Sequence, residues 1–245
     1  MRRTALERIT TDFVPGEIIS YMQMCGTEQA QLQRGMNYRM PTGRSVVLMS
    51  RRPNAPYADE VLDDGRTIIY EGHDMPRSAA TPIPKLVDQP AVFPSGTRTQ
   101  NGTFLKATQD FKAGQRTPEP ILIYEKLKKG IWVFNGVFDL LDGWQVEQEN
   151  RKVFKFRFEV STQKVIHTQL PAETIDELEH PRVIPGIVKQ VVFKRDGGKC
   201  VMCGAADELH FDHVLPYSRG GTSLSADNVQ LLCARHNLQK GAKIQ

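Results

Sequence analysis

The chain has 245 residues, of which 40% are hydrophobic, enough for one large core or two smaller ones. Lysine and arginine outnumber aspartate and glutamate by only four, 32 against 28, so the net charge allows a polyanionic partner without requiring one. The basic N-terminus lacks an apolar segment and no run of 18 apolar residues follows, so we expect neither a secretion signal nor a membrane helix and predict a cytoplasmic protein.

Short apolar runs separated by turn residues predict a mostly β domain from about residue 14 to residue 160. The runs are RSVVLMS (44–50), RTIIYEG (66–72), PILIYEKLKKGIWVFNGVFDLL (120–141) and KVFKFRFEV (152–160). The KKG within the third run predicts a hairpin turn. We also expect a short helix within residues 27–40 and another short element over residues 101–111.

Residues 161–182 mix polar, acidic and proline residues without sustained periodicity and predict a linker, whose acidic part could form a helical turn. The segment GIVKQVVFKRDGGKC (186–200) then spaces its apolar residues as in a helix and stops at a glycine pair. We therefore predict a domain over residues 1–160, a linker over 161–182 and a second domain over 183–245. The second domain is too small to rely on its hydrophobic core alone.

Three of the four cysteines lie in the last fifth of the chain, which favours a metal site over disulfides. Cys200 and Cys203 form a Cys-x-x-Cys pair, and Cys233 with His236 repeats the spacing. Two such pairs suit tetrahedral Zn²⁺ in a closed structural site. We predict that these four residues bind a structural zinc ion.

A closed zinc site has no open coordination position, so any catalysis requires a second centre. Asp212 and Asn237 offer oxygen ligands suited to Mg²⁺, Mn²⁺ or another divalent ion. His213 could serve as the general base for a water molecule that attacks phosphorus. Asp227 is a candidate N-cap for a helix that would begin in this region.

The strings CVMCG (200–204) and LHFDHVLPYSRGGTSLSADNVQLLCARHN (209–237) together resemble the HNH nuclease family. The resemblance implies a ββα-metal fold with a zinc knuckle, His213 as the general base, and Asn228 as the residue that holds the hairpin loop and orients His213. It also implies that Asp212 and Asn237 bind the catalytic ion. Neighbouring residues of a regular strand face opposite sides, so the Asp212–His213 pair requires a break in the pleat or a substrate that bridges both sides.

Three further side chains near this motif have less specific roles. Arg219 and Lys240 are candidates for contacts with DNA phosphates. His210 is expected to be an exposed residue of the hairpin.

Four residues with the chemistry of a base pocket surround one loop of the β domain: Tyr57, Asp59, Glu60 and Tyr70. Aromatic rings can sandwich an extruded base, and a carboxylate can accept a hydrogen bond from the exocyclic amine of cytosine. The loop therefore predicts a base-binding site.

Ordered short motifs across the β domain are similar to the SRA (SET and RING associated) family: GRSVVLMS (43–50), DDGRTIIYEG (63–72), DQ (88–89), NGTFLKA (101–107), WVFNGVFDLLDGW (132–144) and KVFKFRFEV (152–160). The resemblance implies a PUA-like twisted β-barrel that flips a modified cytosine, usually 5-methylcytosine, into a pocket. It places Tyr57 and Tyr70 at the stacking positions and the pocket carboxylate at Asp59 or Glu60, with a slight preference for Asp59. It also places Arg77 in the loop that enters the duplex.

An SRA-like reader joined to an HNH-like nuclease has the architecture of a prokaryotic, type IV-like modification-dependent restriction endonuclease. We therefore expect an α+β protein that binds double-stranded DNA containing 5-methylcytosine or 5-hydroxymethylcytosine and cleaves its backbone nearby, using structural Zn²⁺ and catalytic Mg²⁺. Two alternatives stay open. The chain could be a modified-DNA reader without cleavage, or an unselective HNH nuclease with a PUA-like RNA-binding domain. The sequence also leaves open whether the chain acts alone or as a homodimer.

Overall fold

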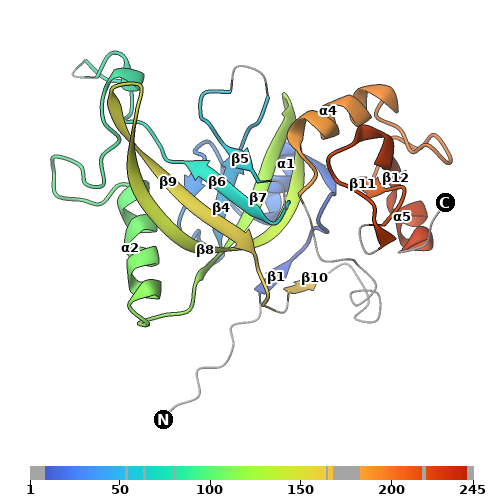
Figure 1. The fold of residues 1–245 in the computed structure, drawn as a ribbon, viewed down its shortest axis with the longest axis horizontal. Helices are drawn as coiled ribbons and strands as arrows, with labels where there is room; N and C mark the ends of the chain where they lie inside the picture. The colour runs from blue at the N-terminus through green and yellow to red at the C-terminus, as the bar shows by residue number, and fades with distance from the viewer. Residues whose placement is uncertain are drawn as a thin grey trace, which may run out of the picture.

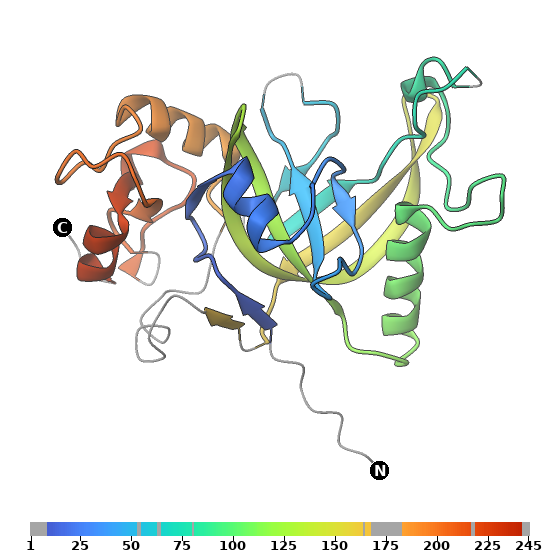
Figure 2. The same ribbon diagram turned by 180° about the vertical axis from the view of Figure 1, so that it is seen from behind.

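The computed structural model describes residues 9–52, 55–62, 65–79, 81–163, 165–167, 183–216 and 219–241. A strongly curved sheet forms the larger part, with a long helix at one side and the C-terminal segment at the other (Figures 1 and 2). The strand order is β3-β4-β7-β8-β9-β6-β5, and β2 pairs with β8. The bounds are β2 (Ile18–Ser20), β3 (Met36–Asn37), β4 (Ser45–Met49), β5 (Glu60–Val61), β6 (Thr67–Glu71), β7 (Glu119–Lys128), β8 (Ile131–Gln148) and β9 (Arg151–Val160).

All neighbouring strands of this sheet run antiparallel except β4 and β7, which are parallel. Register shifts interrupt the β7–β8 pairing after Ile123 and the β8–β9 pairing after Leu140. Such irregularities increase the local twist and bend a strand, consistent with the curvature of the sheet. The predicted strands and the hairpin turn between β7 and β8 are confirmed.

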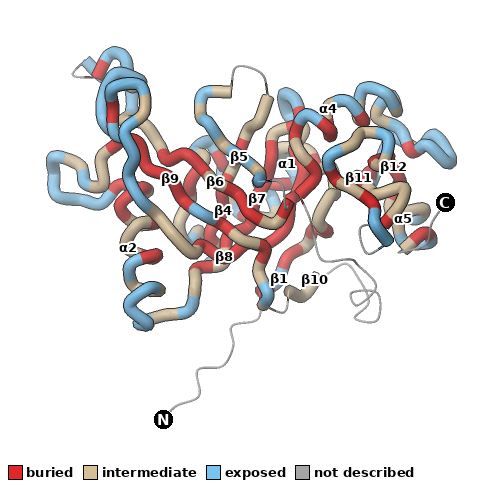
Figure 3. Tube along the Cα trace, in the orientation of Figure 1, coloured by how far each residue is buried: buried red, intermediate tan, exposed pale blue. Residues whose placement is uncertain are grey.

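The concave interior of the sheet is filled by aromatic and branched side chains and appears as a buried band in Figure 3. Helix α2 (Gln100–Lys112) closes one end of this core with the ring of Phe104, which meets Phe156 of β9 edge to face at 5.8 Å between centroids. The Thr99 side chain caps the helix by accepting a hydrogen bond from the backbone N–H of Gly102. The short element expected over 101–111 is thus a helix of 13 residues.

The helix expected within residues 27–40 is wrong. Helix α1 spans Tyr21–Thr27 instead and begins with a capping box formed by Ser20 and Gln23. The helix ends because the Glu28 side chain is buried in the core, where its carboxylate accepts a hydrogen bond from the Tyr124 hydroxyl at 2.6 Å. Gln29 then takes a positive φ of 52°, which ends the helical geometry.

The predicted linker contains a strand, β10 (Val165–His167), which pairs in parallel with β1 (Ile9–Thr11). Residues 164 and 168–182 of the linker lie outside the described residues, and so does its expected helical turn. The predicted helix that follows is confirmed as α4 (Gly186–Arg195). Among the described helices, none combines the length and apolar character needed to cross a membrane.

The C-terminal segment is a hairpin followed by a helix: β11 (Leu209–His213), β12 (Val229–Cys233) and α5 (Ala234–Lys240). The helix start expected at Asp227 is wrong, because Asp227 lies in the 3-10 turn η3 (Ala226–Asn228), whose N-cap is Ser225. The five residues that follow form strand β12 and complete the hairpin. Helix α5 therefore begins only after Cys233. The arrangement is ββα, as the sequence motifs imply.

Candidate nuclease centre and base-binding cavity

The two Cys/His pairs meet at one point. Cys200 and Cys203 lie in the turn after α4, Cys233 ends β12, and His236 lies in the first turn of α5. Their ligand atoms all lie within 4.8 Å of one another, with 3.8 Å between the Sγ atoms of Cys203 and Cys233 and 3.4 Å from the His236 Nδ1 to the Sγ atoms of Cys200 and Cys233. Zinc–sulfur bonds of about 2.3 Å in a tetrahedron place two sulfurs about 3.8 Å apart, so the residues fit a zinc ion.

The charge state of Cys200 suits the same ligand role. Burial raises the pKa of its thiol, but backbone hydrogen bonds, among them those from Cys233 and Cys203, outweigh burial and lower it to about 6. The side chain is therefore largely a thiolate at neutral pH, which is the form that binds metal.

The β11–β12 hairpin carries the adjacent Asp212 and His213 without a break in the pleat. Asp212 pairs with Gln230 and His213 with Val229 in continuous antiparallel register. Of the two expected explanations for this pair, a broken pleat is therefore not observed. The Nε2 atom of His213 lies 2.9 Å from the Ser223 hydroxyl across the loop, a contact that fixes the direction of the ring.

Asn228 ties together the two sides of the loop between β11 and β12. Its Oδ1 accepts a hydrogen bond from the backbone N–H of Leu215 at 2.8 Å, and its Nδ2 donates to the carbonyls of Leu215 and Thr222, both at 3.0 Å. Gly221 packs so tightly here that an added Cβ would lie 1.8 Å from the Leu215 carbonyl oxygen. These contacts hold the loop that follows His213, which agrees with the orienting role expected of Asn228.

Two residues near the motif, Lys240 and His210, are buried, contrary to expectation. Lys240 is buried rather than exposed, and its ammonium lies 3.0 Å from Asp212 Oδ2 and donates to the His213 carbonyl at 2.6 Å. Contact with a DNA phosphate, predicted from its charge, does not fit this placement. His210 is also buried, and its backbone forms a β-bridge with Glu17, the residue before β2, whereas Arg219 is exposed.

The donor types around Asp212 are compatible with a divalent ion. Burial raises the pKa of the Asp212 carboxyl, and Lys240 opposes that shift. Its Oδ2 atom is engaged by Lys240 and by Gln230 at 3.3 Å, which leaves Oδ1 for a metal ion. Asn237 lies on α5, the helix that also carries Lys240, and its side-chain oxygen is a ligand of the same hard type.

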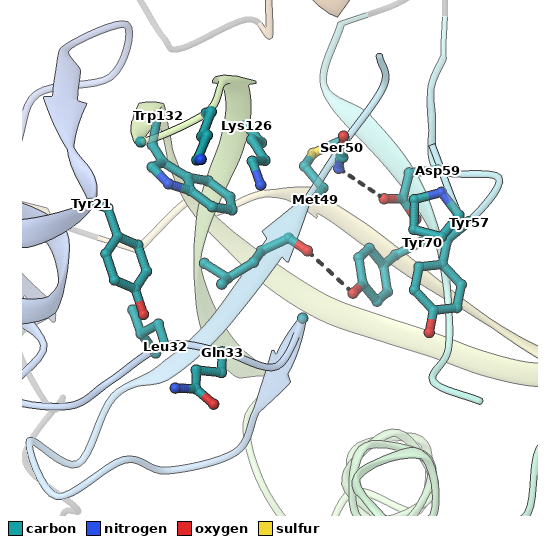
Figure 4. Close-up of a pocket in the computed structure, with 15 residues that line it drawn as sticks. Tyr21, Leu32, Gln33, Met49, Ser50, Tyr57, Asp59, Tyr70, Lys126 and Trp132 are labelled. Carbon is teal, nitrogen blue, oxygen red and sulfur yellow. Dashed lines mark hydrogen bonds between the residues drawn. The ribbon is translucent and has the colours of Figure 1, made fainter. Parts of the chain in front are cut away.

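The larger sheet holds a cavity of about 550 Å³. Tyr57, Asp59 and Tyr70 line it, together with residues of β4, of the β7–β8 hairpin and of the segment around α1 (Figure 4). A second cavity of about 600 Å³ shares Tyr57 and Asp59 and carries charges of both signs, being lined also by the cations Arg51, Arg52, Lys85 and Arg151 and by the carboxylates of Glu71 and Glu149. The described structure thus brings the two predicted tyrosines and one predicted carboxylate to one cavity.

The two candidate carboxylates have different surroundings. Asp59 Oδ1 accepts a hydrogen bond from the Glu71 N–H at 3.1 Å and Oδ2 one from the Ser50 N–H at 3.2 Å, and burial raises the pKa of the carboxyl to about 7. Glu60 is exposed on β5 and does not line either cavity. This geometry favours Asp59 over Glu60 as the pocket carboxylate.

The two tyrosines also differ. Tyr57 is half-buried. The ammonium of Lys85, a residue of η1 (Pro84–Leu86), lies 4.1 Å from the centroid of the Tyr57 ring, and the His73 ring stacks on it with 6.1 Å between the ring centroids. Tyr70 is only 1% exposed, its hydroxyl donates to the Leu48 carbonyl at 3.3 Å, and it forms the wall of the cavity rather than an open platform (Figure 4). Tyr57 is therefore the less buried of the two rings, with Lys85 and His73 against it.

A buried network of charges, missed by the sequence reasoning, supports the Tyr57 loop. The Glu71 carboxylate accepts from the Ala58 N–H at 3.1 Å, from Arg151 at 3.3 Å and from Lys155 at 3.2 Å. Arg151 also pairs with Asp74 at 2.6 Å. No local pattern indicates this network, because Arg151 and Lys155 lie 80 and 84 residues from Glu71 along the chain.

Arg77 lies at the surface, on the segment that leads to η1. Its side chain is exposed, and its Nε donates to the Pro82 carbonyl at 2.9 Å. This contact ties one side of the guanidinium to its own loop. Its predicted entry into the duplex stays a prediction.

Comparison with known proteins supports the interpretation of the C-terminal domain. Residues 200–243 match the model of the HNH endonuclease family, which confirms the predicted resemblance of this part of the chain. No curated protein matches the chain.

Solved structures are similar over larger parts of the chain, at low identity. The SUVH5 SRA domain bound to fully hydroxymethylated CG DNA is 19% identical, covers 69% of this chain and 97% of its own, and has a TM-score of 0.42. The type IV phosphorothioation-dependent restriction endonuclease ScoMcrA is 14% identical over 94% of this chain and 55% of its own, with a TM-score of 0.42. The DNA modification-dependent restriction endonuclease AspBHI is 14% identical over 64% and 79%, with a TM-score of 0.45.

Proposed function

We propose that the chain is a modification-dependent DNA endonuclease, with a reader over residues 1–160 that holds a flipped modified cytosine and a nuclease over residues 183–245 that cuts the backbone nearby. The observation that carries the proposal is the cavity lined by Tyr57, Asp59 and Tyr70 in a chain whose C-terminal part matches the HNH endonuclease family. A cavity of about 550 Å³ has room for a nucleobase, and its chemistry matches the edge and face of cytosine.

The flipped base would stack on Tyr57 and lie against the wall formed by Tyr70. Asp59 keeps free lone pairs on both oxygens after accepting its two backbone hydrogen bonds, so it can accept from the exocyclic amine of cytosine. Because its pKa is about 7, the protonated form is also populated near neutral pH and can donate to the ring nitrogen of cytosine. Arg51 and Arg52, which line the second cavity, would contact the phosphates beside the flipped nucleotide.

In the nuclease, His213 would take the proton from a water molecule that attacks the phosphodiester, with its ring held by Ser223. Asp212 and Asn237 would hold a Mg²⁺ or Mn²⁺ ion, which stabilises the leaving oxygen. Arg219, exposed beside the Asn228 loop, would contact a backbone phosphate. The four zinc ligands would keep α5 packed on the hairpin.

Such an enzyme would act in the prokaryotic cytoplasm against foreign DNA that carries modified cytosine, and would spare host DNA that lacks the mark. The substrate range would include 5-methylcytosine and 5-hydroxymethylcytosine. The reader confines cleavage to marked DNA, because the nuclease itself needs only the backbone and a metal ion.

Replacing Tyr57 by alanine tests the reader. Loss of one stacking ring costs about 1 to 3 kcal/mol, so the preference for modified over unmodified duplex should fall by about 5- to 150-fold. Phosphate contacts survive, so non-specific affinity should change little. Binding is measured at one fixed salt concentration with duplexes of the same sequence.

Asp59→Asn should lower the same ratio, because it removes a carboxylate from the cytosine edge. Glu60→Ala is the matched control, since its side chain is exposed on the neighbouring strand and should leave the ratio unchanged. Should Tyr57→Ala and Asp59→Asn both fold and keep the wild-type ratio, these residues do not form the pocket.

A further inference from the structure

We propose that the large sheet and the HNH domain form one rigid body, locked by Lys189, so that the nuclease cuts at a fixed distance from the flipped base. The inference rests on the proposed function and adds to it the geometry of the cut. Lys189, Glu125 and Asn135 are positioning residues in this account, because they lie outside both the cavity and the nuclease centre.

Lys189 of α4 is a buried lysine that reaches across the junction. Its side chain is 2% exposed, and its ammonium lies 2.6 Å from Glu125 Oε2 on β7 and 2.5 Å from Asn135 Oδ1 on β8. Glu125 and Asn135 also bond to each other at 3.1 Å. A buried charge is tolerated only when it is paired, so removal of the Lys189 side chain alone would leave the Glu125 carboxylate buried without its cation.

The apolar core is also continuous across the junction. Leu127 and Val133 of the β7–β8 hairpin belong to the same buried cluster as Val188 and Val192 of α4. The cluster continues into the nuclease hairpin through residues of β11 and β12, including Phe211, Leu231 and Leu232. The two domains therefore share one core instead of meeting at a polar, hydrated surface.

Gly16 forms a third connection, through the backbone. Its N–H donates to the Phe134 carbonyl of β8 at 2.8 Å, and its own carbonyl accepts from the Phe211 N–H of β11 at 3.0 Å. Gly16 has a φ of +90°, and an added Cβ would lie 2.9 Å from the Phe211 carbonyl oxygen. Only glycine fits this position. One residue thus joins a strand of the sheet to a strand of the nuclease.

The hairpin that carries the junction also lines the base cavity. Lys126 and Trp132 line the cavity, whereas the neighbouring Leu127 and Val133 are buried in the shared core. Adjacent residues of a strand face opposite sides, so the β7–β8 hairpin has the base on one side and the nuclease on the other. Figure 1 shows α4 beside the tip of this hairpin.

The positions of the cuts along the DNA distinguish a rigid connection from a flexible one. A flexible tether of about fifteen residues would let a nuclease reach positions over about 20 Å, or roughly six base pairs at 3.4 Å each. A nuclease fixed to the reader reaches the same phosphodiester bond each time. The distribution of cuts therefore separates a rigid body from a tethered one.

The test uses a duplex with a single modified cytosine, digested by the full chain with Mg²⁺, and maps the ends on both strands at nucleotide resolution. We expect the wild type to cut mainly one bond on each strand. In Lys189→Ala we expect the share of that bond to fall by about threefold or more, because a released module samples several bonds. Lys194→Ala, which removes an exposed lysine from the same helix, should leave the distribution unchanged.

Gly16→Ala disturbs the junction at a separate point and should broaden the distribution in the same direction. Wild-type cuts scattered over about six base pairs would overturn the rigid body while leaving the proposed function intact. Lys189→Ala that is folded, loaded with zinc and still cuts at the wild-type bond would overturn the role of Lys189. Absence of any cleavage of modified duplexes would instead contradict the proposed function.

Amide hydrogen exchange tests the rigid body without DNA. We expect the amides of α4 and of the β7–β8 hairpin to exchange slowly and together in the wild type, and α4 to exchange faster in folded Lys189→Ala. Wild-type protein in which α4 opens independently of the hairpin would overturn the proposal whatever the nuclease does.

Discussion

Replacing His213 by alanine is expected to abolish strand cleavage while leaving binding to modified duplex nearly unchanged. General base catalysis contributes about 10²- to 10⁴-fold to the rate of such a reaction, and no other described histidine shares its position at the end of β11. The reader is a separate site, so the affinity for DNA should survive. The readouts are nicking of a modified plasmid and binding to a modified duplex, both measured on the same preparation.

Two further variants define what His213 does. Ser223→Ala removes the hydrogen bond to the ring but keeps the base, so its loss of rate should be smaller than that of His213→Ala. Asn237→Ala should lower the rate by weakening the hold on the catalytic ion, an effect that added Mn²⁺ or Mg²⁺ should partly restore. His213→Ala that cuts at the wild-type rate would show that the base is elsewhere.

Loss of the zinc ion is expected to unfold the C-terminal domain. We expect purified protein to hold one zinc ion per chain and Cys203→Ser to lose it, because a structural site of this kind contributes its binding energy to folding. Cys203 is exposed, so the change removes a ligand with little loss of packing. Metal analysis and thermal unfolding of wild type and variant measure both effects.

The effect should extend beyond the zinc site, since the core of the HNH domain is shared with the β7–β8 hairpin through Leu127 and Val133. We therefore expect a lower melting temperature for the large sheet as well. Cys25→Ser is the matched control, because Cys25 lies in α1, outside the zinc cluster. Active, folded protein without zinc would contradict this part of the account.

The sequence was sufficient where a local pattern determines the structure. Short apolar runs bounded by turn residues located β4, β6, β7, β8 and β9, and the two Cys/His pairs located the four side chains that meet in one cluster. Helix α1 was missed although Ser20 and Gln23 form a capping box, because the helix-forming residues that follow favour a later start. The burial of Glu28 by Tyr124 and Arg44 overrides that local preference.

Contacts between distant segments could not be predicted in the same way. An apolar pattern shows that Leu127 and Val133 are buried but not that their partners belong to the nuclease. Lysines usually face solvent, so neither Lys189 nor Lys240 carried a signal of burial, and each is buried only because a carboxylate from another element lies beside it. The choice between Asp59 and Glu60 likewise depended on the Ser50 and Glu71 amides, which only the fold brings to Asp59.

Digestion of one duplex sequence in four forms tests the central claim most directly. The duplex carries unmodified cytosine, 5-methylcytosine, 5-hydroxymethylcytosine or glucosylated cytosine, and each form is incubated with the full chain and Mg²⁺ at one salt concentration. The account predicts cleavage of the 5-methylcytosine or 5-hydroxymethylcytosine duplex and sparing of the unmodified one. Equal cleavage of all four forms, or cleavage of none with either Mg²⁺ or Mn²⁺, would contradict it.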